Sequence, residues 1–88
     1  MKNFNKVWDK IIINQGKTFY TKRKLPFTYK IEGNILRTDR TDYNLSIEDF
    51  KKAYEFVPYE KPSILSNDIQ GPSYVWGILH DERIINKL

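Results

Sequence analysis

The only histidine of the chain, His80, is the side chain best suited to acid–base or metal chemistry. Asp81 and Glu82 follow it directly, so the three residues together raise the question of a metal site. A stable site needs three or four converging ligands, and consecutive residues of a helix point in different directions. We therefore predict no metal site, and a histidine that lies at the surface or at a helix end.

Other catalytic and cofactor chemistries find little support in the residue pattern. Serines such as Ser46 and Ser73 stand where caps and turns are expected, and no base and acid accompany them to complete a nucleophilic triad. Gly71 is followed by Pro72, which has no N–H to donate to a phosphate. Because the chain has no cysteine, thiol catalysis, disulfides and cysteine metal centres are excluded. We expect a non-enzymatic protein without a cofactor.

Positive charge is concentrated at the start of the chain. The 15 Lys and Arg against 11 Asp and Glu give a net charge of +4. Residues 1–30 contain eight of these cations and one acid, a charge of +7, whereas residues 31–88 contain seven cations and ten acids, a charge of −3. A basic surface attracts nucleic-acid phosphates, which release counterions when they are neutralised. We predict nucleic-acid binding, to DNA, through a basic N-terminal helix and first hairpin that carry Lys2, Lys6, Lys10, Lys17, Lys22, Arg23 and Lys24.

A repeated Arg-Thr-Asp tripeptide adds Arg37 and Arg40 to these candidates. Arginine suits bidentate contact with phosphate or guanine. In an extended chain, however, residues three apart point to opposite faces, and Asp39 and Asp42 lie close enough in sequence to neutralise both arginines. The basic residues as a whole also have a simpler interpretation, in which they only keep the surface soluble and protect a sheet edge.

Aromatic residues support two kinds of binding surface. Tyr20 and Tyr29 would stack on bases if they lie on the exposed face of the sheet. A second group in the C-terminal half comprises Tyr54, Phe56, Tyr59, Tyr74 and Trp76. Tyrosine and tryptophan dominate protein interfaces, so the alternative function is a protein-interaction module, such as a phage or mobile-element inhibitor or an accessory subunit. The same aromatics could instead hold the long loop that they flank.

The first half of the chain predicts one helix and three strands. Apolar residues with helical spacing, from Phe4 to Ile12, predict a helix over residues 3–14 that ends at Gly16. Alternating residues then predict strands over residues 17–21, 27–32 and 35–38, joined by a charged turn at residues 22–24 and by the Gly33-Asn34 turn. The expected product is a three-stranded antiparallel meander.

The second half predicts two helices separated by a long loop. Ser46 is the expected N-cap of the first helix, with Asp49 at the capping-box position. Its apolar face includes Phe50 and Ala53, and Pro58 ends it. The loop from Pro58 to Pro72 is expected to be functional or to be held by Ile64, Leu65 and Ile69, and the last helix is expected to start at Ser73 and to bury Val75, Ile78 and Leu79.

Length and composition set the frame for these elements. The 88 residues, with a mass of 10.6 kDa, allow one domain. A hydrophobic content of 40% is enough for a small core, and no apolar run is long enough for a membrane span. We predict a single α+β domain over residues 1–88, in the order α-β-β-β-α-α. We expect a cytoplasmic location, no membrane association, and nucleic acid or protein as partner; the oligomeric state stays open.

Overall fold

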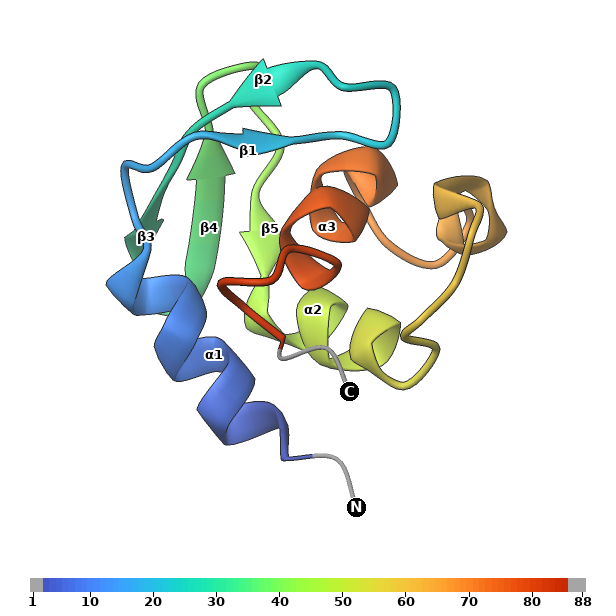
Figure 1. The fold of residues 1–88 in the computed structure, drawn as a ribbon, viewed down its shortest axis with the longest axis horizontal. Helices are drawn as coiled ribbons and strands as arrows, with labels where there is room; N and C mark the ends of the chain where they lie inside the picture. Colours follow the sequence, from blue (N-terminus) through green and yellow to red (C-terminus); the bar gives the residue numbers. More distant parts are fainter. Residues whose placement is uncertain (1–2, 86–88) are drawn as a thin grey trace.

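The computed structural model describes residues 3–85, and it confirms an α+β arrangement. The helices are α1 (Phe4–Ile13), α2 (Ile47–Tyr54), the 3-10 helix η1 (Pro62–Leu65) and α3 (Pro72–Leu79). The strands are β1 (Phe19–Tyr20), β2 (Pro26–Phe27), β3 (Tyr29–Glu32), β4 (Ile35–Thr38) and β5 (Leu45–Ser46). Figure 1 shows the β1–β2 hairpin lying across one end of the sheet and over α3.

The strands pair differently from the predicted meander. β1 pairs only with β2, and the three-stranded antiparallel sheet has the order β3-β4-β5. The predicted second strand is divided at Thr28, whose N–H donates to Asp39 Oδ1 (2.9 Å) and whose carbonyl accepts from the Asp39 N–H (3.0 Å). The chain therefore changes partner at Thr28, from β1 on one side to β4 on the other. The third strand of the sheet is β5, where Leu45 pairs with Leu36 and both side chains are fully buried.

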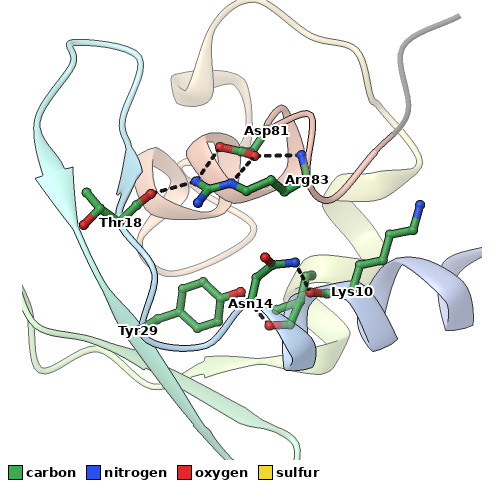
Figure 2. A network of polar contacts seen from close by, with 7 residues as sticks. Lys10, Asn14, Thr18, Tyr29, Asp81 and Arg83 are labelled. Atoms are coloured by element: carbon green, nitrogen blue, oxygen red, sulfur yellow. Dashed lines mark hydrogen bonds and ion pairs between the residues drawn. The ribbon is translucent and has the colours of Figure 1, made fainter.

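Helix α1 begins and ends at asparagines. The Asn3 side chain accepts from the Lys6 N–H (3.4 Å), and the Asn14 amide donates to the Lys10 carbonyl (2.8 Å). Val7, Trp8 and Ile11 are buried, but Ile12, expected on the same face, is exposed because the buried stripe is narrower than predicted. Figure 2 shows how the Tyr29 hydroxyl ties β3 to this helix by donating to the Ile11 carbonyl (2.5 Å). Burial raises the Tyr29 pKa well above its ordinary value, so the hydroxyl remains a donor.

Helix α2 starts as the capping pattern predicts. The Ser46 hydroxyl accepts from the Asp49 N–H (3.2 Å), and Phe50 and Ala53 are completely buried. The long loop after this helix contains η1, and it is held by the buried side chains of Leu65 and Ile69, whereas Ile64 is exposed. This part of the core thus forms from a loop rather than from a regular element.

Helix α3 lies at the centre of the core. It begins at Pro72, one residue before the predicted start, and Val75, Ile78 and Leu79 are fully buried. Gly77 permits close contact with β1, since a Cβ atom at this position would lie 2.4 Å from the Tyr20 carbonyl oxygen.

The turn after α3 is fastened to β1 by Arg83 (Figure 2). Its guanidinium makes two hydrogen bonds to the Asp81 carboxylate (both 2.9 Å) and one to the Thr18 carbonyl (2.7 Å). It also lies 4.0 Å from the centre of the Phe19 ring, in a cation–π contact. Within residues 3–85, no helix has both the length and the apolar character that a membrane span requires.

Candidate nucleic-acid interface

A groove of about 440 Å³ separates the β1–β2 turn from η1 and the start of α3. Three of its lining residues are cations, and none is acidic. We call this feature the basic groove, and its lining residues are Thr21, Lys22, Arg23, Leu25, Lys61, Pro62, Ser63, Ser73 and Tyr74. A concave surface lined by cations and hydroxyl groups offers an anion both positive charge and hydrogen-bond donors.

Thr21 organises the turn that forms one wall of the basic groove. Its N–H donates to the Leu25 carbonyl (3.0 Å), its carbonyl accepts from the Lys24 N–H (2.9 Å), and its hydroxyl accepts from the Leu25 N–H (3.2 Å). Lys24 takes a positive φ of 70° to close this turn. Thr21 is buried, so its three hydrogen bonds are shielded from water and the turn keeps its shape.

The opposite wall is the segment before η1, and α3 holds its backbone. The Tyr59 N–H donates to His80 Nε2 (3.1 Å), and the Trp76 indole N–H donates to the Tyr59 carbonyl (2.7 Å). The His80 ring stacks on Trp76, with ring centroids 4.6 Å apart and an interplanar angle of 18°. Burial raises the Tyr59 pKa to about 12. We call Tyr59, Trp76 and His80 the latch.

The latch determines the protonation state of His80. A backbone N–H can only donate, so Nε2 is unprotonated and Nδ1 carries the ring proton, which it donates to the Trp76 carbonyl (2.9 Å). Burial lowers the His80 pKa below 6.5, and the nearby Lys22 charge lowers it further, although the hydrogen bond to Trp76 acts in the opposite direction. His80 is the C-cap of α3, so the prediction of a helix-end histidine is confirmed. The described residues contain no cluster of potential metal ligands.

Lys22 connects the two walls. Its ammonium donates to the Glu60 carbonyl and lies 5.7 Å from the centroid of the Trp76 ring. The charge of Lys22 is therefore used within the protein, where it holds the turn against the segment before η1. Arg23 and Lys61 are exposed, and they are the two groove cations whose side chains make no hydrogen bond or ion pair with another described residue.

The predicted basic residues do not form one continuous surface. Figure 1 places α1, with Lys6 and Lys10, at the opposite end of the molecule from the β1–β2 turn. Lys17 is exposed in the connection before β1, and Lys24 is exposed next to the groove lining. Lys2 lies outside the described residues. Of the predicted nucleic-acid contacts, only Lys22 and Arg23 line the basic groove.

The two arginines of the repeated tripeptide lie apart from the groove lining. Arg37, on β4, forms an exposed ion pair with Glu32 (3.5 Å), so its charge is paired with an acid of the neighbouring strand β3 and not with the aspartates of the repeated tripeptide. Arg40 is exposed just after β4, where its N–H donates to the Thr38 hydroxyl (3.2 Å). Neither side chain lines the basic groove.

The structure changes the set of candidate contact residues. Two residues join the set and one leaves it. Lys61 lines the groove, but it lies in the long loop, far from the basic N-terminal third. Tyr74, one of the aromatic residues of the predicted protein-interaction surface, lines the groove as well. The suggested base stacking by Tyr29 is wrong, because only 1% of this residue is exposed, whereas Tyr20 is 51% exposed. No local pattern in the sequence links Lys61 to the β1–β2 turn, because the two lie nearly forty residues apart.

Comparison with known proteins adds no functional information. No protein-family model matches the chain, and neither the curated proteins nor the solved structures contain a match.

Proposed function

We propose that this protein binds nucleic acid and that the basic groove is the contact surface. The observation that carries the proposal is the lining of the groove, in which Lys22, Arg23 and Lys61 occur without any acidic residue. These cations come from segments nearly forty residues apart in sequence, and the fold brings them together. A phosphate in the groove would find Arg23 and Lys61 available, together with the hydroxyl groups of Ser63 and Ser73.

The proposed role is non-enzymatic. Both ring nitrogens of His80 are engaged with backbone groups, which supports a structural rather than an acid–base role for the only histidine. The cytoplasmic location and the choice of DNA over RNA stay predictions from the sequence. The protein-interaction alternative loses Tyr59, which is buried, and Trp76 is engaged in the latch, whereas Phe56 is 52% exposed.

The test compares two double variants that remove the same charge from different places. Fluorescence anisotropy would follow binding of labelled single-stranded and duplex DNA at low salt. Arg23→Gln with Lys61→Gln should weaken binding at least about tenfold, because two charge-assisted phosphate contacts are lost. Lys6→Gln with Lys10→Gln, on α1, should change the affinity by less than about twofold, through the general field alone. Equal losses in both variants, or no binding by the natural protein at low salt, would contradict the proposal.

A further inference from the structure

The basic groove has an apolar part that phosphate binding does not need. Leu25, Pro62 and Tyr74 line it next to the cations, and Leu25 is 50% exposed. Phosphate oxygens require donors and charge, whereas the flat face of a nucleobase requires an apolar or aromatic surface. The groove presents both kinds of surface side by side.

Tyr74 is held in place before any ligand arrives. Its ring meets the buried ring of Phe27 edge to face, with centroids 5.1 Å apart and an interplanar angle of 84°. The side chain is half-buried at the start of α3, and the backbone of Leu25 opposite is fixed by Thr21. Little conformational entropy would be lost on binding here, which favours affinity.

The shape of the hairpin favours an unpaired strand over a duplex. Proteins that read duplex DNA insert a helix or a projecting β-ribbon into the major groove. Here β1 packs against α3, close enough for the Tyr20 carbonyl to exclude a side chain at Gly77, and Figure 1 shows the hairpin next to α3. Helices α3 and η1, which border the groove, contain no Lys or Arg. The base faces in a duplex are stacked on one another and cannot reach Tyr74.

We propose that the basic groove binds one unpaired nucleotide of a single-stranded nucleic acid, with its phosphate on Arg23 and Lys61 and its base against Tyr74 and Leu25. The volume of about 440 Å³ is within the range of small-ligand pockets, about 300–1,000 Å³. This inference rests on the proposed function and adds the class of nucleic acid that the groove selects. DNA and RNA strands share the required chemistry.

The first test uses the natural protein and changes only the nucleic acid. Anisotropy titrations would compare a labelled strand of about 15 nucleotides with its duplex and with an abasic strand that has the same number of phosphates. The intact strand should bind at least about fivefold more tightly than either competitor, as expected for one stacked base. An RNA strand of the same sequence would show whether the protein prefers ribose or deoxyribose. Tighter binding of either strand than of its duplex supports the inference.

The second test changes the protein. Tyr74→Leu keeps an apolar side chain against Phe27 but removes the stacking surface, so it should weaken single-strand binding about fivefold or more. Tyr74→Phe should bind like the natural protein. Tyr20→Leu is the matched control, because Tyr20 is an exposed tyrosine that does not line the groove, and its affinity should stay unchanged.

Three results would overturn the inference. They are equal affinity for strand and duplex, equal affinity for the intact and abasic strands, and a folded Tyr74→Leu variant that binds normally. If Arg23 and Lys61 were still required in any of these results, the proposed function would stand and only the choice of an unpaired nucleotide would fail. Absence of binding to every nucleic acid would remove both.

Discussion

His80 is held neutral by two backbone partners, and this makes the latch sensitive to pH. When Nε2 is protonated it becomes a donor and faces the Tyr59 N–H, which also donates, so the hydrogen bond between them is lost. The added positive charge would also stand near the Lys22 ammonium, which faces the latch from the β1–β2 turn. Protonation therefore opposes the packing of the segment before η1.

We predict that the free energy of unfolding falls as the pH is lowered through about 6.5. The His80 pKa is below its ordinary value in the folded protein, so the unfolded chain binds more protons between the two pKa values. Stability is then complete above the unfolded pKa and decreases as the pH falls toward the folded pKa. Urea unfolding measured at intervals between about pH 7.5 and pH 5 would show the decrease.

His80→Gln provides the control for this prediction. The glutamine carbonyl can accept from the Tyr59 N–H at any pH, so the variant should lose most of the change in stability over this interval. His80 is the only histidine, and the unperturbed pKa values of the other side-chain types lie outside this range. An unchanged pH profile in His80→Gln would assign the effect to other groups.

At the scale of elements, the contact between β1 and α3 depends on Gly77. A helix normally gains about 1 kcal/mol when glycine is replaced by alanine. Here the new Cβ would stand 2.4 Å from the Tyr20 carbonyl oxygen and 3.3 Å from a Phe27 ring carbon. We therefore predict that Gly77→Ala destabilises the fold by about 2 kcal/mol, because the hairpin must move away from α3. Thermal unfolding would reveal this destabilisation as a lower midpoint temperature. A raised midpoint would show that the higher helix propensity of alanine outweighs the clash with β1.

The elements whose ends depend on neighbouring residues were predictable from the sequence. The cap of α2 forms between Ser46 and Asp49, three residues apart, and the turn at Gly33 joins the strands as expected. Strand pairing was harder to predict from the sequence, because the break between β2 and β3 at Thr28 depends on Asp39, eleven residues further along. A two-residue strand such as β5 (Leu45–Ser46) has too short a pattern to be recognised in the sequence.

At the scale of the whole molecule, the uneven charge along the sequence does not become one charged face. The described cations of residues 1–30 are spread over α1, the connection before β1, the β1–β2 turn and β3, and α1 and the turn lie at opposite ends in Figure 1. Linear sequence could identify Arg23 as a candidate contact, but not Lys61, since their proximity arises from the tertiary contact between Lys22 and Glu60. The groove therefore forms only when the chain folds, and nucleic-acid binding in the groove should depend on few charges.

The salt dependence of binding should distinguish a local site from a distributed one. For single strands the slope of log K against log salt is about −0.7 for each neutralised phosphate. Arg23 and Lys61 on one phosphate, with the neighbouring Lys24 on the next, neutralise two phosphates and predict a slope of about −1.4, whereas phosphate contacts from all nine basic residues first suggested by the sequence would give about −6. Titrations from about 50 to 200 mM salt would measure it. Lys61→Gln should then reduce the magnitude of the slope by up to about 0.7, and Lys6→Gln should leave it unchanged. A steep slope that is insensitive to Lys61 would place the contacts elsewhere on the surface.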